Sequence, residues 1–476
     1  MKRPLRLWQS RGVPASPGSG PHAEAPAADH SARANGSSAA GLEVSSAGSL
    51  RALIVCDTAS ARYGGEAILP IHYLRVLRSR GHDVWLVTHA RTRVELEDLL
   101  PGETRIHYVE DSALHRLMWR LGLHLPTRFA YFTTGLVSRL AAQFTQRGIV
   151  RRLVATEGID IVHQPMPVSP LEPSLMYDLG APVIIGPMNG GMDYPPGFRR
   201  QRGLHERAMM HIGRASATFL NWLIPGKRKA SLLLVANART REALPHGVCT
   251  NVQELTENGV DLELWTLPAQ PRPPVAEVTR FAFVGRLLGL KAVDLLIEAF
   301  AIARQHAPMR LVIVGDGEAR RDLERLAASL LPVGAPGAET PVRFTGWVPQ
   351  IECAGELARA DCLVMPSLHD CGGAVVLEAM AMGKPVIATA WGGPLDYLDA
   401  SCGVLIEPAG RAALVEGLAH AMVRLANAPA ERDAMGRAAR QKVERHYDWE
   451  VKADRVVHLY RDVIAAEQAG AIVAPN

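Results

Sequence analysis

Short apolar runs rich in β-branched residues alternate with longer stretches of helical periodicity, and this alternation constrains the fold more than any other feature. The runs lie at residues 51–57, 84–88, 105–109, 159–163, 182–186 and 231–237, and again at 281–285, 311–315, 342–346, 361–366, 385–389 and 403–408. Runs without polar alternation are typical of strands buried on both faces of a parallel sheet, whose strands are joined by crossover helices. The sequence therefore predicts an α/β fold.

The two series of runs predict two domains, because 476 residues exceed the usual size of one domain. Residues 266–278 are rich in proline, as expected of a stiff linker. The expected division is a disordered Ala/Ser/Gly/Pro-rich tail at 1–50, an N-terminal Rossmann-like domain at 51–265, the linker at 266–278, a C-terminal Rossmann-like domain at 279–446, and a helix at 447–476 that returns to the N-terminal domain. Two doubly wound sheets would carry ligand crevices at the carboxyl ends of their strands, with an interdomain site.

Composition excludes several classes of protein. Hydrophobic residues make up 48% of the chain, so a fibrous or wholly disordered protein is excluded. The six cysteines form no C-x-x-C pair, which favours reduced thiols in the cytoplasm. No apolar stretch has the length of a membrane span or follows Met1 as a secretory signal would. The histidines contain no H-E-x-x-H, and no metal site is expected.

The net charge of +4 is unevenly distributed, since residues 51–260 are basic and residues 261–476 are acidic. Seven arginines and no acid fall between Ser112 and Thr156 among aromatic and aliphatic residues, and a second basic run occupies residues 199–229. This pattern fits contact with an anionic membrane surface, or solvated helix faces over a core. Nucleic acid is the least favoured partner, and a cytoplasmic protein, peripheral at the inner face of the membrane, is the expectation that follows.

Residues 366–389 (PSLHDCGGAVVLEAMAMGKPVIAT) predict a strand end, a Gly-Gly turn and a helix from about Gly373 to Met382. Gly372 and Gly373 allow backbone N–H groups to approach a ligand, and the helix start offers unpaired donors with a partial positive charge, which suits a phosphate. Asp370 precedes the turn. Glu378 lies inside the helix, where a carboxylate can bind both hydroxyls of a vicinal diol.

A second element, FAFVGRLLGLKAVDLLIEAF, places two cations after a strand. Arg286 can bind phosphate oxygens in bidentate fashion, and Lys291 can act as a mobile point charge. Two cations at the carboxyl end of a parallel strand suit a diphosphate, and the topology of a doubly wound sheet predicts that they lie beside the Gly-Gly turn.

These two elements resemble the family-four retaining glycosyltransferases, which have the GT-B fold, and the similarity extends from about Ala52 to Ile464. It also includes NGVDLELW, residues 258–265. The resemblance implies that Arg286 and Lys291 stabilise a nucleotide diphosphate leaving group, that Glu378 binds ribose hydroxyls and that Asp370 holds the donor sugar. The residues expected on the donor side are Gly285, Arg286, Lys291, Trp347, Asp370, Cys371, Gly372, Gly373, Ala374 and Glu378.

The chain departs from the family pattern at three places. Asp370 stands where the family usually has Glu, Cys371-Gly372 replaces the common Gly-Phe, and Ala292 follows Lys291 where Gly is usual. A carboxylate that is one methylene shorter reaches less far toward the sugar, so the donor sugar stays open.

The acceptor side is expected in the N-terminal domain. The resemblance places Gly64 and Gly65 in a glycine-rich loop, where a plain tight turn is the alternative, and Asn189 and Gly190 in an interdomain loop. His163 ends an apolar run, where the family often has a catalytic histidine. A structural role for His163 is equally compatible with its sequence.

The resemblance implies transfer of a sugar from a nucleotide-diphosphate sugar, with UDP or GDP as the nucleotide, to a saccharide or lipid-linked acceptor. The anomeric configuration would be retained, no cofactor or metal would be needed, and the setting would be polysaccharide or glycoconjugate biosynthesis. Two alternatives stay open: a nucleotide-sugar 2-epimerase of the same fold, and a non-catalytic nucleotide-sugar-binding protein.

Overall fold

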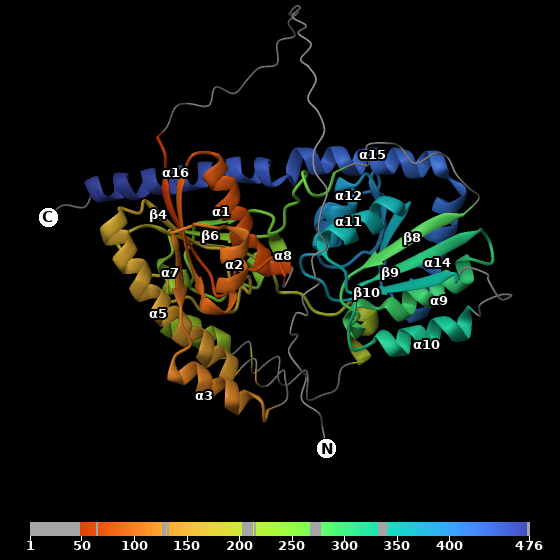
Figure 1. Cartoon of the computed structure of the whole chain (residues 1–476), viewed down its shortest axis with the longest axis horizontal. Helices are drawn as coiled ribbons and strands as arrows, with labels where there is room; N and C mark the ends of the chain where they lie inside the picture. The colour runs from red at the N-terminus through yellow and green to blue at the C-terminus, as the bar shows by residue number, and fades with distance from the viewer. Residues whose placement is uncertain are drawn as a thin grey trace, which may run out of the picture. The chain divides into compact units, whose positions relative to one another are not determined.

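The computed structural model in Figure 1 describes residues 48–473, except 63–64, 126–129, 131–132, 202–212, 214–215, 267–277 and 332–339. The predicted disordered tail and the predicted linker fall almost entirely outside the described residues, as does Gly64.

The first sheet has seven strands in the order β3-β2-β1-β4-β5-β6-β7. Its strands are β1 Arg51–Val55, β2 Asp83–His89, β3 Ile106–Val109, β4 Ile161–Gln164, β5 Val183–Met188, β6 Leu232–Val235 and β7 Val252–Glu254. All neighbouring pairs run parallel, as in Leu53 beside Trp85 of β2 and beside Val162 of β4. The strand order reverses at β1 and β4, which creates the crevice expected of a doubly wound sheet.

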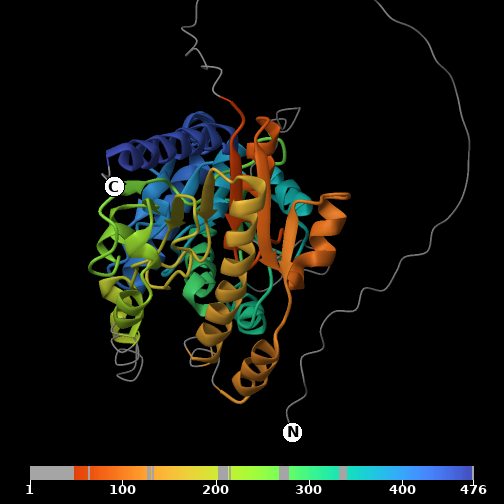
Figure 2. The same ribbon diagram turned by 90° about the vertical axis from the view of Figure 1, so that its left-hand side faces the viewer.

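Helices cover both faces of this sheet. They are α1 Leu69–Ser79, α2 Arg93–Leu99, α3 Ala113–Gly122, α5 Thr134–Glu157, α7 Gly226–Lys229 and α8 Ala238–Glu242, with the short turns η1 Gly65–Ile68, η2 Ala90–Thr92 and η3 Pro196–Gln201 and a helical segment at 216–223. α3 packs on α5, and both extend from the sheet toward the same end of the domain (Figure 2).

The second sheet has six parallel strands in the order β10-β9-β8-β11-β12-β13. Its strands are β8 Thr279–Val284, β9 Met309–Val314, β10 Val342–Gly346, β11 Cys362–Met365, β12 Val386–Thr389 and β13 Gly403–Ile406. Its helices are η4 Gly289–Lys291, α9 Val293–Ala303, α10 Arg320–Leu330, α11 Gln350–Arg359, α12 Ala374–Ala381, α13 Pro394–Tyr397 and α14 Arg411–Asn427. The predicted fold class, α/β with two doubly wound sheets, is confirmed.

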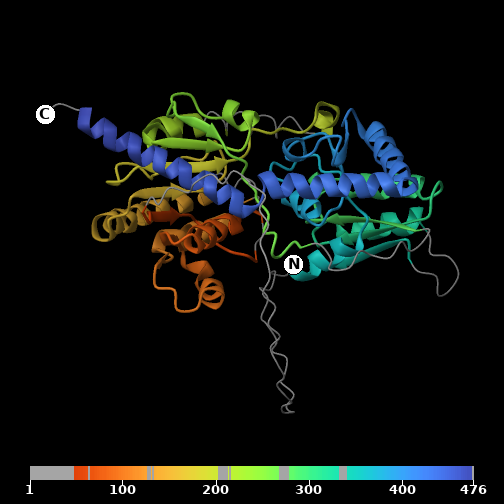
Figure 3. The same ribbon diagram turned by 90° about the horizontal axis from the view of Figure 1, so that it is seen from above.

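Two long helices close the chain, α15 Pro429–His446 and α16 Trp449–Val473. α15 packs on α12, whereas α16 packs on α1, so the two helices serve different sheets (Figure 3). Trp449, Val456 and Tyr460 of α16 are buried in the same hydrophobic core as Ile54 and Tyr73. The C-terminal helix thus completes the first core, whose apolar surface would otherwise be exposed to water.

Candidate functional site

The switch point of the second sheet lies between β8 and β11, and the loops that follow these two strands meet there. The backbone N–H of Leu368 donates to the carbonyl of Leu290 at 2.9 Å, which ties the loop after β11 to the loop after β8. Gly315 follows β9 and lets the end of that strand lie close to the Gly285 backbone, since a Cβ at Gly315 would lie 2.0 Å from the Gly285 carbonyl oxygen. The topology therefore brings the two predicted motifs to one place.

Lys291 and Asp370 form an ion pair across these loops. The other carboxylate oxygen of Asp370 accepts a hydrogen bond from the backbone N–H of Gly373 at 3.1 Å. Lys291, Asp370 and the start of α12 thus form one connected cluster. Both charged side chains keep some solvent exposure, 20% for Lys291 and 15% for Asp370, so a ligand can reach them.

Arg286 lies in the same loop as Lys291 but has a different environment. It is exposed. Within the described part of the chain its guanidinium has no hydrogen bond or ion pair. One loop thus carries an unpaired guanidinium and a paired ammonium, and only the ammonium must exchange a partner to bind an anion.

The Gly-Gly turn is tightly packed, and Gly373 has a positive φ of +62° as the residue before α12. The N–H of Gly393 donates to the Asp370 carbonyl at 2.9 Å. A Cβ at Gly393 would lie only 2.4 Å from the Gly372 carbonyl oxygen. Gly393 on one side and the start of α12 on the other therefore hold the backbone of residues 370–373 in one conformation. Ala374 is the first residue of α12.

Glu378 is half-buried in α12. Burial raises the pKa of its carboxyl to about 7. Among the described residues its carboxylate has no hydrogen-bond or ion-pair partner, so its oxygens are available to a bound ligand.

Sequence reasoning missed Glu257, which is 4% exposed. Its carboxylate accepts a hydrogen bond from the Asn189 side-chain amide at 2.6 Å, and the same amide nitrogen lies 3.0 Å from the Cys371 carbonyl oxygen. Burial, followed by the nearby charge of Glu66, raises the pKa of Glu257 to about 7. Asn189 thus bridges Glu257 to the loop after β11. The available signal was the position of Glu257 directly before NGVDLELW.

The remaining acceptor-side residues surround this bridge. Gly190 exchanges hydrogen bonds with the Thr240 hydroxyl, at 3.1 Å from the Gly190 N–H and 3.3 Å to its carbonyl. Gly65 begins η1 with a φ of +54°, and the next residue, Glu66, is close enough to affect the pKa of Glu257. Burial also raises the pKa of Cys371 to about 12, so its thiol stays protonated at neutral pH.

His163 lies in a different environment from the one that a catalytic role requires. It is fully buried, with Nε2 2.6 Å from the Gly186 carbonyl oxygen and Nδ1 2.7 Å from the Tyr460 hydroxyl. Because a carbonyl can only accept, Nε2 carries the proton and Nδ1 accepts from Tyr460. Burial lowers the pKa of His163 to about 4. Both ring nitrogens are occupied, and the geometry favours the structural interpretation over the catalytic one.

Trp347 lies next to Gly346, whose carbonyl accepts a hydrogen bond from the Gly315 N–H at 2.9 Å. It directly follows β10 and is 68% exposed. In the described ranges it makes no hydrogen bond or ring contact. It follows the carboxyl end of β10, the edge of the sheet at which the clustered residues also lie, and its predicted role stays a prediction.

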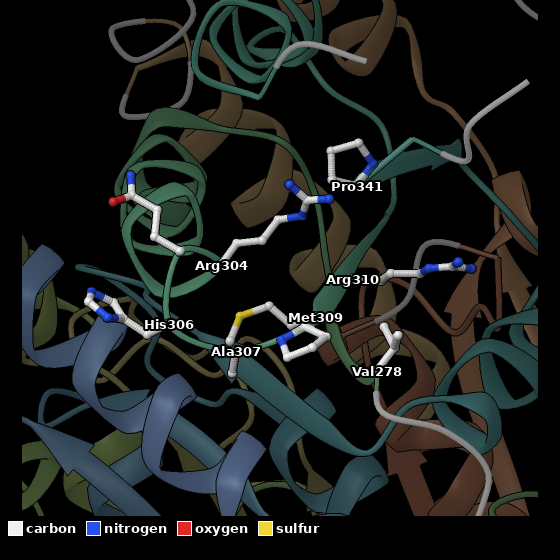
Figure 4. Close-up of a pocket in the computed structure, with 9 residues that line it drawn as sticks. Val278, Arg304, His306, Ala307, Met309, Arg310 and Pro341 are labelled. Carbon is white, nitrogen blue, oxygen red and sulfur yellow. The ribbon is translucent and has the colours of Figure 1, made fainter. Parts of the chain in front are cut away.

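A hollow of about 600 Å³ lies at the opposite edge of the second sheet (Figure 4). It is lined by residues that precede β8 and β10 and begin β9, namely Val278, Arg304, Gln305, His306, Ala307, Pro308, Met309, Arg310 and Pro341. These are amino ends of strands, whereas the clustered residues follow carboxyl ends. The hollow is therefore separate from the candidate site.

Other classes of site find no support in the described part of the chain. All six cysteines are free thiols. The described residues contain no group of three or more His, Cys, Asp or Glu side chains able to hold a metal ion. No helix formed by these residues is both long and apolar enough to span a bilayer.

Comparisons with known proteins agree with this geometry. The profile of the group 1 glycosyl transferases matches residues 278–427. D-inositol 3-phosphate glycosyltransferase from Kribbella flavida is 33% identical over 227 residues, which are 45% of this chain and 52% of the relative. Glycogen synthase from Mycobacterium tuberculosis is 30% identical over 245 residues, covering 50% of this chain and 55% of the relative. The chain thus aligns with about half the length of these relatives.

Solved structures match over most of the chain at low identity. Sucrose-phosphate synthase from Thermosynechococcus elongatus has a TM-score of 0.59 at 20% identity, covering 87% of this chain and all of that one. HepE from Anabaena, solved in complex with UDP, has a TM-score of 0.58 at 15% identity with the same coverage. These likenesses confirm the GT-B fold. Residues 278–427 thus match the profile of the group 1 glycosyl transferases, within a chain of the GT-B fold.

Proposed function

We propose that this chain is a glycosyltransferase that moves a sugar from a nucleotide-diphosphate sugar to an acceptor with retention of the anomeric configuration. One observation carries the proposal: Lys291, Asp370 and the Gly373 N–H form a connected cluster at the switch point of the second sheet. Beside it lies the unpaired cation of Arg286. The cluster offers positive charge and amide donors for a diphosphate, and a carboxylate for a sugar hydroxyl.

In this proposal the bond between the anomeric carbon and the diphosphate oxygen breaks, and negative charge develops on the departing phosphate. Arg286 and Lys291 stabilise that charge, with Lys291 exchanging Asp370 for a phosphate oxygen. The acceptor oxygen bonds to the anomeric carbon from the same face, and its proton passes to the departing diphosphate. Asp370, released from Lys291, accepts from a donor-sugar hydroxyl.

Glu378 would bind the ribose of the nucleotide. Its carboxyl has a raised pKa and no partner among the described residues, so two ribose hydroxyls would supply the hydrogen bonds that it lacks. Asn189 and Gly190 would line the acceptor side, because Asn189 contacts the Cys371 carbonyl of the donor-side loop.

The relatives support UDP or GDP as the nucleotide. HepE was solved with UDP, and a Corynebacterium glutamicum relative of 30% identity is a GDP-mannose-dependent mannosyltransferase. We propose a cytoplasmic reaction in polysaccharide or glycoconjugate assembly, on a saccharide or lipid-linked acceptor. The free thiols of all six cysteines fit a reducing compartment.

A thermal-shift titration of wild type and Glu378→Gln with UDP, GDP, ADP and CMP tests the donor site. A ligand at 100 times its Kd adds about 2.7 kcal/mol of apparent stability. We expect one nucleoside diphosphate to stabilise the wild type and Glu378→Gln to lose most of that shift. Glu416→Gln, an exposed carboxylate on α14, is the control and should keep it. Absence of stabilisation by every nucleotide would contradict the proposal.

A further inference from the structure

The N-terminal domain exposes an unusual set of apolar side chains on α3 and on the helix at 216–223. We define the Trp-Arg surface as Leu114, Arg116, Leu117, Trp119, Arg120, Leu121 and Leu123 with Phe219, Trp222, Leu223 and Arg228. Trp119 is 66% exposed and Trp222 is 65% exposed. Several exposed apolar side chains on one helix, and more on a second helix at the same end of the domain, mark places that meet another molecule or a membrane.

The two helices belong to one end of the domain. α3 packs on α5, and Gln143 of α5 donates to the Pro173 carbonyl at 3.3 Å. Asn221, between Phe219 and Trp222, donates to the Leu171 carbonyl at 2.8 Å. Residues 171–173 therefore contact both α5 and the helix at 216–223, and Figures 1 and 2 show both helices at the same end.

The exposed apolar residues of α3 belong to a well-formed helix. Ser112 caps the helix: its hydroxyl accepts from the His115 N–H, and the His115 ring accepts from the Ser112 N–H. His115 is buried, so the inward contacts of α3 are made. The leucines and Trp119 instead face solvent around Arg116 and Arg120, where a water-soluble helix ordinarily carries polar residues.

The positive charge of this surface indicates which kind of molecule binds to it. No Asp or Glu occurs between Ser112 and Thr156 or between Arg207 and Arg241. Arg116, Arg120 and Arg228 are exposed, and no carboxylate of the described residues pairs with them. Among the residues that the structure describes, Arg116 donates only to a backbone carbonyl, that of Asp111, at 2.7 Å. Apolar and tryptophan side chains interleaved with arginines that have no carboxylate partner match a layer of anionic headgroups over hydrocarbon, where indole rings lie at the interface.

The position of the surface fits an acceptor held in a membrane. α3 follows β3, so it lies at the carboxyl edge of the first sheet. Asn189 directly follows β5 at the same edge and contacts the donor-side loop. An amphiphilic acceptor anchored in the bilayer would thus meet the edge of the sheet that carries the acceptor-side residues.

We infer that the Trp-Arg surface docks this protein on an anionic lipid bilayer. The inference goes beyond the proposed function, because docking and sugar transfer are separable. Docking uses Trp119, Trp222 and the arginines of α3, whereas nucleotide binding uses the second sheet.

Co-sedimentation of the full chain with vesicles tests the inference, using phosphatidylcholine alone and phosphatidylcholine with about one third phosphatidylglycerol. We expect sedimentation with the anionic vesicles, weakened by added salt. Trp119→Gln with Trp222→Gln should lower the partition coefficient about tenfold or more. Arg116→Gln with Arg120→Gln should lower it about 25-fold, since each arginine near an anionic surface contributes about fivefold.

Matched controls lie elsewhere on the chain. Val94→Gln with Ile351→Gln removes two other apolar side chains, 71% and 67% exposed, and Arg321→Gln with Arg325→Gln removes two exposed arginines of α10. Both control pairs should sediment as wild type, and all variants should keep the circular dichroism and the nucleotide-induced thermal shift of wild type. That retained shift separates loss of docking from failure of the proposed function.

Three outcomes would overturn the inference. One is equal recovery of wild type in the supernatant with both kinds of vesicle. Another is sedimentation that both surface pairs leave unchanged. The third is a concentration-dependent dimer in light scattering that Trp119→Gln with Trp222→Gln abolishes, since a second copy of the chain would then cover the surface.

Discussion

The two domains carry their polar strand-end residues in opposite environments. In the C-terminal domain Arg286, Lys291 and Asp370 follow strand ends and remain accessible. In the N-terminal domain His163 also ends a strand, yet both of its ring nitrogens are bonded inside the protein. A place at the carboxyl end of a parallel strand is therefore insufficient for a chemical role. The side chain must also keep a bonding atom that the fold does not use.

The arginines of α3 also differ from other surface arginines of the chain. Arg320 pairs with Glu324 in the C-terminal domain, and Arg93 pairs with Glu110 in the N-terminal domain. Arg116 and Arg120 on α3 have no carboxylate partner in the described part of the chain. A surface charge in an ion pair already has a partner. Arginines that lack a carboxylate partner and lie near exposed tryptophans can instead bind another molecule.

The largest expected effect is on the two cations of the donor-side cluster. Lys291→Ala and Arg286→Ala should each lower the release of nucleoside diphosphate from the matching nucleotide sugar about 100-fold or more, since each removes charge stabilisation from the leaving group. Steady-state kinetics measures this. Arg321→Ala, an exposed arginine on α10, is the control. Wild-type turnover in both site variants would sink the assignment of the cluster.

A smaller effect is expected at Gly393, which supports the Gly-Gly turn from outside. Gly393→Ala places a Cβ 2.4 Å from the Gly372 carbonyl oxygen, so the backbone of the turn must shift. Overpacking of this kind costs about 1–3 kcal/mol, which corresponds to about 5- to 150-fold weaker nucleotide binding if the turn forms the phosphate site. Isothermal titration measures the affinity. Gly410→Ala, where a Cβ meets nothing within 4 Å, should bind normally. Unchanged affinity in Gly393→Ala would show that the turn does not bind the nucleotide.

His163→Phe should change stability and leave catalysis intact. It leaves the Gly186 carbonyl and the Tyr460 hydroxyl without their partner, at about 1–3 kcal/mol for each buried group. Tyr460→Phe should destabilise less, because only one lone pair of His163 loses its donor. Urea unfolding and turnover per folded molecule are the two readouts. A large fall in turnover with full stability would instead establish the catalytic role.

The smallest effect concerns pH and Glu378. Burial raises the pKa of this carboxyl from 4.5 to about 7 in the folded protein. The folded chain therefore holds a proton that the unfolded chain has released between these values, and stability from this group is lost as pH rises through 7. The Glu378→Gln variant has no carboxyl group to ionise, so it does not lose this stability as the pH rises.

Without nucleotide, Glu378→Gln should gain stability relative to wild type between pH 5 and 8, by about 1–3 kcal/mol. Thermal unfolding at several pH values measures the difference. Glu257 also has a raised pKa, but it is present in both proteins and cancels in the comparison. A difference that stays flat with pH would mean that Glu378 is solvated in the folded protein.

The elements expected to bind the donor could be predicted because the residues that form them lie close together in the sequence. Strand, Gly-Gly turn and helix follow within residues 362–381, and the structure has them as β11 and α12. The N-terminal site was less accessible to prediction. Glu257 and Asn189 lie 68 residues apart, and only the packing of the loops after β5 and β7 brings their side chains together.

By itself the sequence determined the two parallel sheets and the nature of the chemical groups at their edges, because apolar runs, glycine turns and charged residues act through local backbone preferences. Tertiary structure decided which of these groups stay available. It buried His163 between Gly186 and Tyr460, paired Lys291 with Asp370 and left the arginines of α3 exposed. Solvent access and hydrogen-bond partners depend on neighbours far away in sequence, so no local pattern could specify them.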